Sequence, residues 1–107
     1  MHIQIINFHL KNVTEEQYGK LCDQLAPAFA NVPGLIEKVW LANRATNTYG
    51  GVYTWRDTQA MLDFAQSELF KAFATSPNFV NITSRDFDLM EDQAGLLNGF
   101  PATVPAR

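Results

Sequence analysis

Residues 35–55 read LIEKVWLANRATNTYGGVYTW, and this stretch decides the fold. Its two apolar runs, 35–41 and 49–55, are rich in the β-branched and aromatic residues that favour strands. The polar segment 43–48 between them is typical of a hairpin loop. The paired Gly50 and Gly51 indicate a bulge or a close approach of backbone. The sequence therefore predicts two adjacent antiparallel strands in the middle of the chain.

A strand and a helix are predicted upstream of this hairpin. Residues 3–10 are mainly Ile, Phe and Leu, as in a buried strand. The segment 14–17, TEEQ, matches a capping box, in which the Thr side chain and the third helical residue satisfy each other's backbone N–H groups. Apolar residues then recur at helical spacing from Tyr18 to Phe29. Pro27 should kink the helix or loosen its last turn.

A helical region and a strand are also predicted downstream. Asp57 is a suitable N-cap for a helix over about 58–66, and a second short helix or an offset turn is expected to reach Ala74. Residues 79–89 alternate as a fourth strand. The resulting order is strand, helix, strand, strand, helix, strand, which is the α+β ferredoxin-like arrangement with a four-stranded antiparallel sheet.

The first strand carries apolar side chains on both faces. One face holds Ile6, Phe8 and Leu10, and the other holds Ile3, Ile5, Asn7 and His9. Helices can cover only one side of this sheet, so the second side needs other cover. We expect a second copy of the chain to supply it, giving a homodimer with two sheets packed face to face, the dimeric α+β barrel.

Length and charge narrow the remaining possibilities. The 107 residues suit one domain, expected over 1–90, with a tail over 91–107 that packs on the domain or on the partner subunit. The formal net charge is −3 and no basic stripe is present, which argues against nucleic acid and membrane surfaces as partners. No secretory signal is visible, and the single Cys22 excludes an intrachain disulfide, so a cytoplasmic location is expected.

Three short motifs resemble one family. PGLIEKVW at 33–40, GGVY at 50–53 and FDL at 87–89 are similar to the YdhR-like monooxygenases, which belong to the dimeric α+β barrel superfamily together with the antibiotic-biosynthesis monooxygenases. The resemblance covers roughly residues 32–90. It implies oxidation of a small phenolic or polycyclic aromatic substrate by O₂ without metal or other cofactor. The protein would bind the ring, stabilise its anion and exclude water.

Residues 53–56 and 68–72 also resemble the haem-degrading branch of that superfamily. That branch uses an Asn on the first strand, a Trp on the second helix and a haem-ligating His near the end of that helix. Asn7 fits the first position, whereas the other two positions fall at Phe64 and near Ala74. The resemblance therefore argues against haem ligation.

Three residues are candidate catalytic groups in a pocket expected between the sheet and the helices. Asn7 could hold a substrate oxyanion, or it could be a buried amide bonded to neighbouring backbone. His9 could be the general base, or a histidine at the rim of the sheet. Tyr53 could donate a hydrogen bond or relay a proton. His2 and His9 should lie on opposite strand faces, which argues against a metal site.

Aromatic side chains are candidates for binding the substrate. Trp40, Trp55 and Phe64 could line the pocket, although each could equally be ordinary core. Arg85, and also Lys38, could stabilise a substrate anion or form an ion pair at the interface with Asp86, Asp88 or Glu37. Two other functions stay open. One is a dimer that binds a small apolar ligand without chemistry, and the other is a non-redox isomerase or cyclase.

Overall fold

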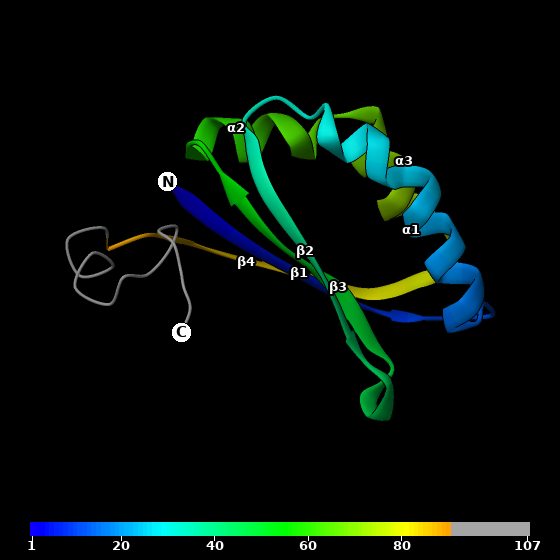
Figure 1. The fold of residues 1–107 in the computed structure, drawn as a ribbon. Helices are drawn as coiled ribbons and strands as arrows, with labels where there is room; N and C mark the ends of the chain where they lie inside the picture. The colour runs from blue at the N-terminus through cyan, green and yellow to red at the C-terminus, as the bar shows by residue number, and fades with distance from the viewer. Residues whose placement is uncertain (91–107) are drawn as a thin grey trace.

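The computed structural model describes residues 1–90, and these form one antiparallel sheet covered by helices. The elements in chain order are β1 (His2–Leu10), α1 (Glu15–Ala30), β2 (Leu35–Asn43), the 3₁₀ turn η1 (Arg44–Thr46), β3 (Thr48–Trp55), α2 (Thr58–Ala65), α3 (Glu68–Thr75) and β4 (Phe79–Asp88). The strand order across the sheet is β2-β3-β1-β4. Helices α1, α2 and α3 lie on the same side of the sheet (Figure 1). The α+β ferredoxin-like fold is confirmed, while the expected tail at 91–107 lies outside the described residues.

The helices begin where the sequence indicates. The Thr14 hydroxyl accepts a hydrogen bond from the backbone N–H of Gln17 at 3.1 Å, and the Gln17 side chain accepts one from the backbone N–H of Thr14 at 2.8 Å. The capping box is therefore confirmed. Asp57 caps α2, and Ser67 caps α3 by accepting from the N–H of Phe70. Ser67 thus divides the second helical region into two helices, as predicted.

The two faces of β1 have different surroundings. His2, Gln4, Ile6 and Phe8 are buried beneath the helices, whereas the alternate residues of β1 are only half-buried. In the β1–β3 register, Gln4 lies opposite Tyr53. Tyr53 therefore faces the helices as well.

Gly50 marks a close approach of backbone at the centre of the sheet. Its φ is +153°, and a Cβ atom there would lie 1.8 Å from the carbonyl oxygen of Ile6. The close approach of backbone expected at the paired glycines is therefore present. The register shift in the β2–β3 pair lies elsewhere, between Leu35 and Glu37. A second irregularity, in the β1–β4 pair, coincides with Asn81, whose φ is +56°.

Within residues 1–90, no helix covers the other face of the sheet (Figure 1). Val39 lies opposite Val52 on this face, and Phe87 lies opposite Ile3. The side chains of Val39 and Phe87 are 46% and 52% exposed. Large apolar side chains are thus left in contact with water on this face.

No helix in residues 1–90 combines the length and the apolar character that crossing a membrane requires.

Candidate functional site

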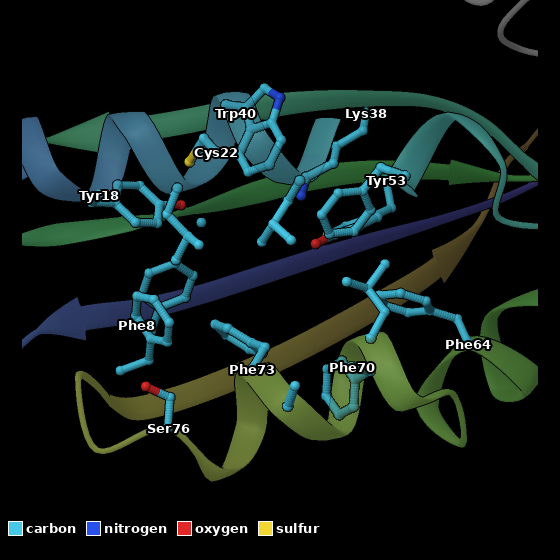
Figure 2. Close-up of a pocket in the computed structure, with 17 residues that line it drawn as sticks. Phe8, Tyr18, Cys22, Lys38, Trp40, Tyr53, Phe64, Phe70, Phe73 and Ser76 are labelled. Carbon is cyan, nitrogen blue, oxygen red and sulfur yellow. The ribbon is translucent and has the colours of Figure 1, made fainter. Parts of the chain in front are cut away.

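A cavity lies between the sheet and the helices, and it encloses about 260 Å³. Aromatic side chains from both layers line most of it: Phe8, Tyr18, Phe29, Trp40, Tyr53, Phe64, Phe70, Phe73 and Phe79. Figure 2 labels most of them, and these come from all three helices and from the strands: Phe8, Tyr18, Trp40, Tyr53, Phe64, Phe70 and Phe73. A core cavity of about 150 Å³ is able to hold benzene. The larger cavity therefore has room for a ligand of about two fused rings.

Helix α1 forms one wall of this cavity without closing it. None of its residues is fully buried, although its apolar stripe faces the sheet. The first turn is tied down, because Glu15 accepts hydrogen bonds from the Tyr49 hydroxyl at 2.8 Å and from Arg44 at 3.0 Å. At the other end, Phe29 packs edge-on against Trp40. The helix is thus held at both ends above a hollow.

Among the described residues, Lys38 is the one charged group that lines the cavity. Its Nζ atom lies 3.3 Å from the ring centroid of Phe29, 3.4 Å from that of Trp40 and 4.8 Å from that of Tyr53. No carboxylate pairs with it in the part of the chain that the structure describes. Burial lowers the pKa of Lys38 to about 7, and only the nearby Cys22 thiol acts in the other direction. Close to neutral pH, the amine is therefore present in both protonation states.

The hydroxyl of Tyr53 is another polar group of the cavity, which Tyr18, Cys22 and Ser76 also line. It points toward the hollow (Figure 2), and no hydrogen bond to it is found within residues 1–90. Burial raises the pKa of the Tyr53 phenol, so the hydroxyl keeps its proton at neutral pH. Lys38 and Tyr53 thus supply an amine and a hydroxyl donor in a wall that is otherwise largely apolar. A ligand oxygen could accept hydrogen bonds from both.

Strand register explains how these two groups meet. Lys38 is the β2 partner of Tyr53, and next to them Trp40 is the partner of Gly51. A Cβ atom at Gly51 would lie 3.1 Å from Cε of Lys38 and 3.3 Å from a ring carbon of Tyr53. The missing side chain therefore leaves the space that the lysine stem and the tyrosine ring occupy.

Three of the residues expected to line a pocket do line this cavity, namely Tyr53, Trp40 and Phe64. Trp55 does not. It is fully buried beside the cavity, stacks on Tyr53 with a centroid distance of 5.9 Å, and donates from Nε1 to Gln4 at 3.0 Å. Trp55 is thus a core residue that supports the Tyr53 ring.

Asn7, His9 and Arg85 lie on the other side of the sheet. Ile5 pairs with Arg85 on β4, and Asn7 follows Ile5 on the same face of β1. The Asn7 amide donates to the carbonyl oxygen of Tyr49, and His9 Nδ1 lies 2.9 Å from the side-chain amide of Asn81. The structure therefore does not bring Asn7 and His9 together with Tyr53, and their expected catalytic roles receive no support from the cavity.

His2 belongs to a separate polar network at the start of β1. Its ring nitrogens contact Asp88 at 2.7 Å and Asp86 at 2.6 Å, and the ring itself is buried. Desolvation lowers the pKa of His2, but the hydrogen bonds to the two aspartates outweigh it and the net pKa is raised. Within the described residues, no group of three or more His, Cys, Asp or Glu side chains could hold a metal ion.

Fold and cavity together define the class: a ferredoxin-like α+β protein with a largely apolar cavity under its helices. The chain belongs to the family described as "Putative mono-oxygenase ydhR", whose model matches residues 3–99. No curated protein matches the sequence.

Solved structures share the fold at low sequence identity. The haem degrader MhuD from Mycobacterium tuberculosis, with two haems bound in its active site, is 18% identical with a TM-score of 0.67, covering 84% of this chain and 96% of its own. A point mutant of SnoaB, a cofactor-independent oxygenase from Streptomyces nogalater, is 20% identical with a TM-score of 0.64, covering 83% and 93%. A protein from Deinococcus radiodurans described as a putative antibiotic biosynthesis monooxygenase is 11% identical with a TM-score of 0.69, covering 83% and 92%.

The residues of this chain do not fit haem bound through histidine. The sequence has two histidines, and neither lines the cavity. His2 is held by two aspartates, and His9 lies on the opposite face of the sheet.

Proposed function

We propose that this protein is a cofactor-independent monooxygenase that oxidises a small phenolic or bicyclic aromatic compound with O₂. The observation that carries the proposal is the aromatic cavity in which the Lys38 amine lies beside the Tyr53 ring. Membership of the mono-oxygenase family supports the reaction class. The apolar wall suits a flat ring and keeps water away from reactive intermediates.

The neutral form of Lys38 acts as the base in the first step. It takes the proton of the bound phenol, and the resulting ammonium lies beside the phenolate that it has formed. Because the pKa of Lys38 is about 7, about half of the amine is unprotonated at pH 7 before the reaction. After the transfer, the amine keeps the proton because the ammonium pairs with the phenolate. The Tyr53 hydroxyl donates a hydrogen bond to the phenolate oxygen. Lys38 is thus the proposed base in place of His9, and Tyr53 is the proposed partner of the oxyanion in place of Asn7.

The phenolate then reacts with O₂. It passes one electron to O₂, and the phenoxyl radical and superoxide combine at a ring carbon that carries hydrogen. The peroxide loses water and leaves a quinone, so one mole of phenol and one mole of O₂ give one mole of quinone and one of water. One oxygen atom enters the product, and the substrate itself supplies all the electrons.

Oxygen isotope labelling tests this proposal. Purified, chelator-treated protein with 1-naphthol and ¹⁸O₂ should consume O₂ and yield naphthoquinone with one labelled oxygen. Lys38→Met should slow O₂ consumption by about 10²-fold or more, as expected for loss of a general base. Lys71→Met, which removes an exposed lysine on α3, is the matched control. Binding of naphthols without O₂ consumption across a panel of phenols would instead indicate a ligand-binding protein.

We also propose that the protein is a homodimer in which the open faces of two sheets pack together. The exposed apolar residues Val39 and Phe87 on that face support this arrangement. Arg85 and Phe87 are two positions apart on β4, so their side chains lie on the same face of the sheet. The proposed interface therefore also contains a charged residue.

A further inference from the structure

We infer that Lys38 is also a nucleophile, and that the cavity condenses its amine with a small aromatic aldehyde to form an imine. This chemistry uses the same cavity as the proposed oxygenation but requires neither O₂ nor a phenol. It assigns a second activity and a second ligand class, aromatic carbonyl compounds, to the site. Three features of the site favour this reaction: the position of the Lys38 amine, its apolar surroundings and the Tyr53 hydroxyl beside it.

The position of the amine favours attack on a bound carbonyl. Lys38 reaches Nζ into the aromatic wall, where it lies 3.3 Å from the ring centroid of Phe29 and 3.4 Å from that of Trp40 (Figure 2). A flat aldehyde that fills the cavity would pack on the same rings and bring its carbonyl carbon near the amine. An amine buried in apolar surroundings is the arrangement that activates lysine for Schiff-base formation.

The surroundings leave the amine without a competing partner. No ion pair to Lys38 exists within residues 1–90, and its pKa of about 7 provides a substantial neutral fraction at physiological pH. The other titratable side chains that line the cavity are the Tyr18 phenol and the Cys22 thiol on α1 and the Tyr53 phenol on β3. Burial raises the pKa of all three, so none supplies a negative charge that would hold the ammonium form near pH 7. The nitrogen lone pair is therefore available.

Tyr53 supplies the acid that the condensation needs. Its hydroxyl points into the cavity without a hydrogen bond from the described residues, and it can donate to the carbonyl oxygen. The amine nitrogen forms a bond to the carbonyl carbon, and the oxygen becomes a hydroxyl. That hydroxyl leaves as water with a proton donated by Tyr53, which regains it from the nitrogen. One aldehyde and one amine thus yield one imine and one water.

Reductive trapping tests this inference directly. The protein is incubated at pH 7 with 2-naphthaldehyde and cyanoborohydride, which reduces an imine to a stable secondary amine. Intact mass should show the addition of one naphthylmethyl group, and peptide mapping should place it on Lys38. Labelling there should be roughly tenfold or more faster than at Lys11, Lys20 or Lys71, because these exposed lysines lie outside the cavity that would hold the aldehyde beside the amine.

Variants and competition separate a built site from general lysine reactivity. Lys38→Met should lose the single fast addition, Lys71→Met should keep it, and 2-naphthol should compete with it. Tyr53→Phe should slow the reaction while the label stays on Lys38. Labelling spread evenly over the lysines, or unaffected by 2-naphthol, would overturn the inference. Imine trapping does not use O₂, so it can succeed when naphthol oxidation fails, and naphthol oxidation can succeed when trapping fails. The two experiments therefore test imine formation and oxygenation separately.

Discussion

Placing the Lys38 amine among aromatic rings lowers the stability of the folded protein. An ammonium surrounded by three aromatic rings has given up most of its hydration, and the rings replace only part of what water supplied. A protein selected for stability alone would place an apolar side chain of similar length there. Retention of the lysine is therefore an argument for function, since active sites often sacrifice stability for a reactive group.

Lys38→Met should accordingly stabilise the protein. We expect the free energy of unfolding to rise, by about 1 to 4 kcal/mol if the gain resembles that seen when buried ion pairs are replaced with well-packed apolar residues. The unfolded lysine has a pKa near 10.4 and the folded one a pKa of about 7. Between these values the unfolded state binds more protons, so wild-type stability rises with pH.

The advantage of the methionine variant should therefore be larger at pH 6 than at pH 9. Urea denaturation at the two pH values measures it, with Lys71→Met as a control for loss of an exposed charge. A variant that is less stable than the wild type at pH 6 would contradict this account of the buried amine.

His2 should contribute stability with the opposite dependence on pH. Its two aspartate partners raise its pKa in the folded state above the ordinary 6.5. Its contribution is fully present below pH 6.5 and is lost as pH rises through the folded-state pKa.

Thermal unfolding of the wild type and His2→Gln over pH 5.5–8.5 measures this effect. The difference in Tm should be largest at the acid end and should shrink as pH rises. Raising the salt concentration should reduce it in part, because Asp88 is largely exposed. A difference that grew toward alkaline pH would show that the ring is held in its neutral form.

At the scale of elements, the centre of β3 depends on a residue without a side chain. An added Cβ at Gly50 would collide with the Ile6 carbonyl oxygen, and the φ of +153° is one that other residues rarely adopt. Gly50→Ala should therefore separate β1 from β3, with a loss of about 3 kcal/mol or more. Gly19→Ala is a useful comparison, because the added methyl meets nothing within 4 Å and helix interiors favour alanine. Chemical denaturation should show destabilisation for the first variant and a neutral or stabilising change for the second.

The order of elements was predictable because it depends on local patterns. Caps at Thr14 and Asp57 and the alternation of apolar residues act over a few positions, and the structure confirms them. The register shift between Leu35 and Glu37 was not predictable, because it depends on pairing with β3. That shift helps to set which side of β2 faces the helices, and so whether Lys38 enters the cavity.

The sequence also could not predict which face of β1 lines the cavity. The pattern correctly places Asn7 and His9 on one face, but both faces are apolar and nothing local tells which one the helices cover. The apolar stripe of α1 is also the same whether it packs on a core or borders a hollow. A signal for Lys38 did exist: a charged residue amid the apolar residues of β2, two positions before Trp40, which pairs with Gly51.

At the scale of the whole molecule, the proposed homodimer depends on the sheet face opposite the helices. Its apolar residues leave a surface that a second copy can cover by two-fold symmetry, burying β1 on both sides. Such packing would also stiffen the floor of the cavity, because Val39 and Trp40 are neighbours on β2 and face opposite sides. Assembly and the cavity would then be linked through a single strand.

Sedimentation should detect a dimer at micromolar concentration, and a charge placed on this face should dissociate it. Phe87→Asp puts a carboxylate where two apolar surfaces meet, and a buried unpaired charge costs several kcal/mol, so the dissociation constant should rise by about 10²-fold or more. Leu62→Asp is the matched control, because Leu62 is also large, apolar and 51% exposed but lies on α2, on the helical side of the sheet. If both variants sediment like the wild type, or if the wild type is a monomer, the sheet face is not the interface, and its apolar residues need another explanation.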